Sequence, residues 1–179
     1  MTSTRPDSAA VVRAAACIKN RVHRTPVLTS THIDRLADAR LYFKCENLQR
    51  VGAFKIRGAT FALANLTAEQ ARSGVATHSS GNHGAALALA ARERGMPAYV
   101  VMPETAPAVK FAAVAGYGAE IIRCGPSLAS REAALAAVLA KTGATFIAPY
   151  NHADIIAGQG TAALELCADV ADLDCLLAP

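Results

Sequence analysis

Lys55 has the surroundings of a lysine that could attack a carbonyl group. It lies between Phe54 and Ile56 in the segment GAFKIRGA, residues 52–59, where the apolar pattern predicts the first turn of a helix. The positive end of a helix and nearby hydrophobic surface both lower the pKa of a lysine, which favours the neutral, nucleophilic amine. The alternative interpretation is an ordinary solvated lysine at a helix start, since the local pattern alone fits both.

A loop of small and polar residues is the second candidate. The segment THSSGNHG, residues 77–84, follows a predicted strand and opens a helix that is apolar throughout residues 85–91. Backbone N–H groups at a helix start bind anions, here a carboxylate, and Gly81 and Gly84 would let a ligand approach the backbone closely. The alternative is a plain capping loop, with the N-cap at Ser79, Ser80 or Asn82.

Strands and helices alternate along the chain that must position these residues. Short apolar runs predict strands at residues 41–45, 75–77, 98–102, 120–123, 145–148 and 174–178. Helical patterns are predicted at residues 8–21, 31–37, 54–65, 67–73, 82–94, 108–117, 128–141 and 155–167. This alternation predicts an α/β fold with a parallel sheet and right-handed crossovers. Ligand sites in such sheets lie beyond the carboxyl ends of the strands.

Taken together, the two candidate segments resemble the fold-type II pyridoxal 5'-phosphate (PLP) enzymes, in particular the serine/threonine dehydratase and serine racemase branch. Further matches follow in the family's order: PAYVVMP at 97–103, AP at 106–107, YGA at 117–119, REA at 131–133 and AGQGT at 157–161. The resemblance covers about residues 25–179. It implies a tryptophan synthase β-like, three-layer α/β fold in which the small domain is complete and the large domain is truncated.

The resemblance also implies a role for each matching residue. Lys55 would form the Schiff base with PLP and later take the substrate's α-proton, with Phe54 packed beside the cofactor ring. Asn82 would hydrogen-bond the ring's phenolic oxygen and tune its electronics. Ser80 matches the acid/base on the opposite face in racemases, although dehydratases carry a serine there too. The substrate carboxylate would be held by Ser79, Ser80, Gly81, Asn82, His83 and Gly84.

The sequence departs from the family pattern in two respects. Ala85 stands where many members have glutamine. In addition, the family continues after a strand like residues 174–178 into a glycine-rich loop that cradles the PLP phosphate. It later supplies a hydroxyl residue facing the pyridine nitrogen and the acidic metal ligands of the racemase branch. These features would all lie beyond Pro179, so we expect an N-terminal fragment.

The expected organisation follows from the resemblance. Residues 1–53 would belong to the large domain, residues 54–150 would form the small domain with a four-stranded parallel sheet, and residues 151–179 would begin the return to the large domain. The implied reaction is β-elimination of L-threonine or L-serine to a 2-oxo acid and ammonia. One alternative is an inactive fragment that lacks the phosphate-binding loop. Others, for a complete chain, are serine racemase and 3-hydroxyaspartate dehydratase. The sequence does not choose among these substrates.

Composition and charge argue against several other classes. The net charge of +4 comes from scattered lysines and arginines without interleaved aromatics, so no nucleic-acid partner is expected. No apolar run reaches the ~18–20 residues of a membrane span, and residues 1–7 lack a signal peptide's apolar region, so the cytoplasm is the expected location. Histidines and cysteines lack metal-ligand spacing, so no metal site is expected. The partners that remain are a small amino-acid substrate and, as is common in the family, a second copy of the complete chain.

Overall fold

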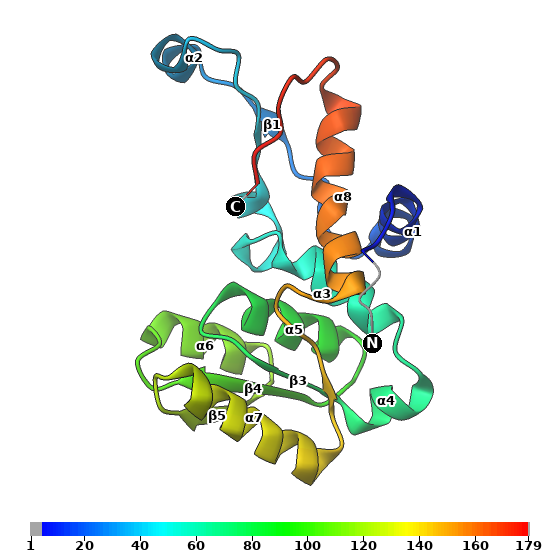
Figure 1. Cartoon of the computed structure of the whole chain (residues 1–179), viewed down its shortest axis with the longest axis vertical. Coiled ribbons are helices and arrows are strands. Elements are labelled where there is room, and N and C mark those ends of the chain that lie inside the picture. Colours follow the sequence, from blue (N-terminus) through cyan, green and yellow to red (C-terminus); the bar gives the residue numbers. More distant parts are fainter. Residues whose placement is uncertain (1–4, 179) are drawn as a thin grey trace.

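A four-stranded parallel sheet forms the centre of the computed structural model, which describes residues 5–178 (Figure 1). The strand order is β5-β4-β3-β6. The two central strands are largely buried along their length, so they read as continuous apolar runs rather than as alternating patterns. The expected α/β fold with a parallel sheet is confirmed. The strands are β3 (Val75–His78), β4 (Ala98–Pro103), β5 (Glu120–Cys124) and β6 (Thr145–Phe146).

Helices cover both faces of this sheet and complete the expected three layers (Figure 1). Helices α5 (Asn82–Glu93) and α6 (Ala108–Gly116) lie on one face, and α7 (Leu128–Thr142) lies on the other. Val100 packs with the α5 and α6 layer, whereas its neighbour Val101 packs with α7, as the alternation of side chains along a strand requires. The alanines and leucines of α5 from 85 to 91 are all buried, so this helix packs between the sheet and a further helix.

The order of the strands contains one reversal. The chain runs outward from β3 to β4 and β5, and then α7 carries it back to β6 on the opposite side of β3. The connection after β3 leads to β4 on one side, whereas β6 lies on the other side of β3. The strand order therefore reverses between the carboxyl ends of β3 and β6. In open α/β sheets this is the place where ligands bind.

A group of helices packs outside the α5 layer. Helix α3 (Lys55–Ala64) contacts α5 on one side and α8 (Ala153–Asp169) on the other, and α8 also packs against α1 (Ser8–Ile18). A Cβ atom at Gly158 would lie 2.6 Å from the Cα of Gly58, so α3 and α8 cross with their backbones in direct contact. The short helix α4 (Ala68–Ser73) connects α3 to β3 and ends at Gly74, whose φ of 86° suits glycine.

An arm projects from the molecule at the end far from the sheet (Figure 1). It comprises residues 27–44, with β1 (Val27–Leu28) and β2 (Phe43–Lys44) pairing antiparallel and α2 (Thr31–Ala37) at the tip. The Ser30 side chain caps α2, yet none of the helix's residues is buried. The tip of the arm is thus held by local hydrogen bonds, without a core of its own.

Some predicted boundaries differ from the structure. The strand predicted at residues 174–178 is wrong, because among the described residues no strand lies beside this run to complete its backbone hydrogen bonds. Leu177 in that run is 91% exposed. Two 3-10 turns, Glu46–Leu48 and Arg50–Gly52, were not predicted. No helix within residues 5–178 is both long and apolar enough to cross a membrane.

Candidate active site

Lys55 and the 79–84 loop meet at the carboxyl ends of β3 and β6. The segment 147–149 that follows β6 contacts both: Lys55 Nζ donates to the Pro149 carbonyl at 2.9 Å, and His83 Nε2 lies 3.3 Å from the Ile147 carbonyl. The charge of Lys55 also helps to lower the pKa of His83, as expected for near neighbours. The two segments singled out in the sequence therefore form one site, at the point where the strand order reverses.

Lys55 is the first residue of α3 and is half-buried. Desolvation lowers the pKa of its ammonium below the ordinary value for lysine. The Phe54 ring lies beside it, with 5.1 Å between Nζ and the ring centroid. A lowered pKa increases the share of neutral amine, the form that attacks an aldehyde such as that of PLP. The surroundings of Lys55 thus fit the predicted attachment point.

The Ser79 hydroxyl organises the loop from within. Its oxygen accepts hydrogen bonds from the backbone N–H groups of Gly81, at 3.2 Å, and Gly84, at 3.1 Å. Two of the N–H groups expected to hold a carboxylate are therefore already bonded. The N–H groups of Asn82 and His83, in the first turn of α5, have no acceptor among the described residues and suit an anion.

The two glycines of this loop have different surroundings. A Cβ atom at Gly84 would lie 2.9 Å from Val100 Cγ1, so this glycine allows α5 to pack against β4. Gly81 has no heavy atom within 4 Å of its would-be Cβ, so its face of the loop is open. Of the two, Gly81 is the position where a ligand could approach the backbone.

Ser80 and Asn82 lie at this open face, and both are exposed. Asn82 Oδ1 accepts a hydrogen bond from Lys110 Nζ at 2.8 Å. Sequence reasoning missed Lys110, because its contact depends on helices that follow different strands. No hydrogen bond among the described residues links Ser80 to Lys55, so the acid/base role of Ser80 stays a prediction.

His83 is the buried member of the loop, with 3% of its surface exposed. Its Nε2 faces the Ile147 carbonyl, which can only accept, so Nε2 carries the proton and Nδ1 is left as an acceptor. Nδ1 is buried and has no hydrogen-bond partner among the described residues. Desolvation lowers the pKa of His83 to about 4. The imidazole is therefore neutral at physiological pH.

A buried ion cluster holds α3, and with it Lys55, in place. The fully buried Arg57 donates to Glu46 before the helix and to Glu165 on α8, at 2.7–2.9 Å. Burial alone would lower the pKa of Arg57, but the two carboxylates outweigh it and raise the pKa above its ordinary value. Lys44 at the base of the arm also pairs with Glu165, at 2.7 Å. This Arg57 cluster was not predicted.

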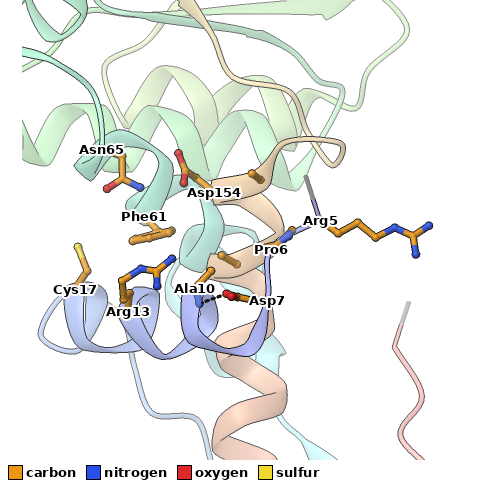
Figure 2. Close-up of a pocket in the computed structure, with 11 residues that line it drawn as sticks. Arg5, Pro6, Asp7, Ala10, Arg13, Cys17, Phe61, Asn65 and Asp154 are labelled. Carbon is orange, nitrogen blue, oxygen red and sulfur yellow. Dashed lines mark hydrogen bonds between the residues drawn. The ribbon is translucent and has the colours of Figure 1, made fainter. Parts of the chain in front are cut away.

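A pocket of about 610 Å³ lies elsewhere, between α1, α3 and the start of α8 (Figure 2). The charged residues that line it are of both signs: Arg5, Arg13, Asp7 and Asp154. None of the predicted site residues lines this pocket. The site with matching chemistry is therefore the open face around Lys55. Within residues 5–178 no three His, Cys, Asp or Glu side chains are grouped as metal ligands.

Comparison with known proteins places this geometry in a family. The family model "Pyridoxal-phosphate dependent enzyme" matches residues 18–179. The β-hydroxyaspartate dehydratase of Paracoccus denitrificans is 52% identical over 162 residues, which cover 90% of this chain and 51% of that protein. The solved structure of maize serine racemase is 48% identical with a TM-score of 0.93, over 96% of this chain and 52% of that one.

A more distant solved relative, a T.th. threonine deaminase, is 41% identical with a TM-score of 0.84, over 91% of this chain and 51% of that one. The chain spans about half the length of the relatives it matches. The chain belongs to the fold-type II family of pyridoxal-phosphate dependent enzymes.

Proposed function

We propose that this chain supplies the cofactor lysine and the carboxylate-binding loop for PLP-dependent β-elimination of a small hydroxy amino acid. The products would be a 2-oxo acid and ammonia. The observation that carries the proposal is the meeting of Lys55, whose pKa is lowered, with the open first turn of α5. A nucleophilic amine and an anion site side by side suit an amino acid bound through its carboxylate.

PLP, when bound, supplies an electron sink for the negative charge that develops at the substrate's Cα. The chain's own residues would orient the amino acid and move its proton. The N–H groups of Asn82 and His83 would bind the carboxylate, and the neutral Lys55 amine would accept the α-proton. The substrate's hydroxyl leaves with a proton as water, and a second water hydrolyses the resulting enamine to the 2-oxo acid and ammonia.

The substrates proposed are L-serine, L-threonine and 3-hydroxyaspartate. The 52% identity to a β-hydroxyaspartate dehydratase supports the third at least as well as the first two. Serine racemisation is the second candidate, favoured by the 48% identity to maize serine racemase and by Ser80, the residue expected on the opposite face. We also propose a cytoplasmic location and, for the full length of the family, a homodimer. If the chain is instead an inactive fragment, it should form no 2-oxo acid in the assay described next.

Titration of the purified chain with PLP tests the proposal. Wild-type protein should give the absorption of PLP bound at Lys55, and Lys55→Ala should lose it, because alanine has no amine. Lys141→Ala serves as the matched control, since Lys141 is an exposed lysine on α7. 2-Oxo acid should then form from at least one of the three substrates, and only with Lys55 present.

Each result has a defined meaning. Bound PLP without 2-oxo acid, but with D-serine formed from L-serine, would favour the racemase candidate. Bound PLP with neither product would support the alternative of an inactive fragment. A spectrum that is the same in wild type and Lys55→Ala would refute Lys55 as the attachment point.

A further inference from the structure

The contact between Lys110 and Asn82 joins two helices at the mouth of the site. Lys110 Nζ donates to Asn82 Oδ1 at 2.8 Å. Asn82 is the first residue of α5 and Lys110 lies in the first turn of α6. Because β3 and β4 are neighbours and parallel, the helices that follow them begin at the same edge of the sheet, which brings the two side chains together.

This contact distinguishes the two ends of the Asn82 amide. An asparagine side chain carries one accepting oxygen and one donating NH₂ group, whereas a lysine ammonium can only donate. Lys110 therefore selects the orientation in which Oδ1 faces α6. The Nδ2 group is turned to the other side, where it has no acceptor among residues 5–178, and it remains free to donate to a ligand.

Helix stability does not explain a lysine at position 110. The start of a helix carries a partial positive charge, so a cation in the first turn is unfavourable there. The first turn of α6 contains no acidic residue that would offset it. Residues that disagree with the local preferences of a helix in this way are commonly found at functional sites.

We propose that Lys110 is a positioning residue that orients the Asn82 amide so that Nδ2 donates to the phenolic oxygen of PLP. This inference rests on the proposed function, since it needs PLP at Lys55. Lys110 itself stays on the α6 side of Asn82 and acts only through that amide. Arginine, which also only donates, keeps the orientation, whereas glutamine, which both donates and accepts, releases it.

The first test needs no cofactor and follows the side-chain NH₂ resonances of Asn82 by NMR. Lys110→Met and Lys110→Gln should shift these resonances, while Lys110→Arg should leave them near their wild-type positions. Lys141→Met is the matched control for the loss of a surface lysine and should leave them unchanged. Unchanged Asn82 resonances in Lys110→Met would overturn the proposal.

The second test measures PLP binding and the pH dependence of the bound cofactor's absorption. Loss of one hydrogen bond should weaken PLP binding about three- to ten-fold in Lys110→Met, and the absorption change should move along the pH axis. Asn82→Ala should have the same effects, and the double variant should show no further loss, because the two residues act through one contact.

The outcomes separate this inference from the proposed function. Normal PLP binding by wild type with additive losses in the double variant would overturn the role of Lys110 and leave the proposed function intact. Loss of bound PLP in Lys55→Ala together with non-additive losses would support both. Absence of Lys55-dependent PLP binding in wild type would overturn both.

Discussion

At the scale of single residues, His83 combines deep burial with a ring nitrogen that lacks a partner among the described residues. Burial disfavours the charged imidazolium, and this effect exceeds the favourable hydrogen bond to the Ile147 carbonyl. The nearby charges of Lys55 and His78 lower the pKa further, and the result is a pKa of about 4 in place of 6.5. Protonation of His83 is therefore linked to unfolding.

The pH dependence of stability follows from this linkage. Between pH 6.5 and about 4 the unfolded chain binds a proton at His83 and the folded chain does not, so stability rises with pH in this window. The contribution of His83 should be complete above pH 6.5 and should be lost on acidification to pH 4, by about 3 kcal/mol. Urea unfolding at a series of pH values measures it.

A variant pair isolates the contribution of His83. His83→Gln should flatten the slope of unfolding free energy against pH between 4 and 6.5, because glutamine does not titrate. His32→Gln, on the exposed helix α2, should keep the wild-type slope. Equal slopes in the two variants would show that His83 is not the group responsible.

Sequence reasoning found the residues of the site better than it found their partners. Lys55 and the 79–84 loop could be recognised because each is a local motif at a helix start. The pairing of Lys110 with Asn82, 28 residues apart, depends on which strands are neighbours. The low pKa of His83 depends on burial by segments that no local pattern specifies.

At the scale of elements, the crossing of α3 and α8 decides where Lys55 lies. The two helices approach so closely that Gly158 has room for a hydrogen atom only, since a Cβ there would also lie 2.8 Å from the Arg57 carbonyl oxygen. The obstructing atoms are backbone, which cannot rotate away. A side chain at 158 would therefore push α8 from α3.

We expect Gly158→Ala to lower the free energy of unfolding by about 1–3 kcal/mol, because overpacking outweighs the better helix propensity of alanine. Gly116→Ala on α6 is the matched control: its Cβ would meet nothing within 4 Å, and it should stay within about 1 kcal/mol of wild type. Urea denaturation compares them. A Gly158→Ala protein at least as stable as wild type would contradict the tight crossing.

Element boundaries could be predicted where a residue with a specific cap or turn role marks them. Ser30 and Thr67 cap α2 and α4, and Gly74 ends α4, so these helices lie close to their expected ranges. The apolar run at 174–178 has no such marker, and only a neighbouring strand could have made it a strand. The 3-10 turn at 50–52, in which Val51 takes a φ of 59°, was unpredictable because valine disfavours that conformation.

At the scale of the whole molecule, we retain the division into residues 1–53, 54–150 and 151–179 as a proposal. The sheet and its three covering helices lie within the middle range, whereas the arm and the run at 170–178 contribute little to any core. Exposed apolar side chains mark the arm, with Leu36 75% exposed. Such segments open at low free-energy cost.

Native-state hydrogen exchange tests this division. Amides in residues 54–150 should exchange most slowly and as one unit, with β3 and β4 slowest, while residues 27–44 and 170–178 should exchange first. Helix α8 is the informative element. If its amides exchange in the same step as β3 and β4, the chain is a single cooperative unit and the boundary at 150 is wrong.

The Arg57 cluster has a consequence for the order in which the chain folds. Its partners stand 11 residues before and 108 residues after it, so the second carboxylate is synthesised well after Arg57 itself. A guanidinium buried with part of its charge uncompensated costs several kcal/mol. We infer that α3 packs fully only after residue 165 has left the ribosome. Until then Lys55 stays more hydrated than in the folded chain, so a smaller share of it is the neutral amine that attacks aldehydes.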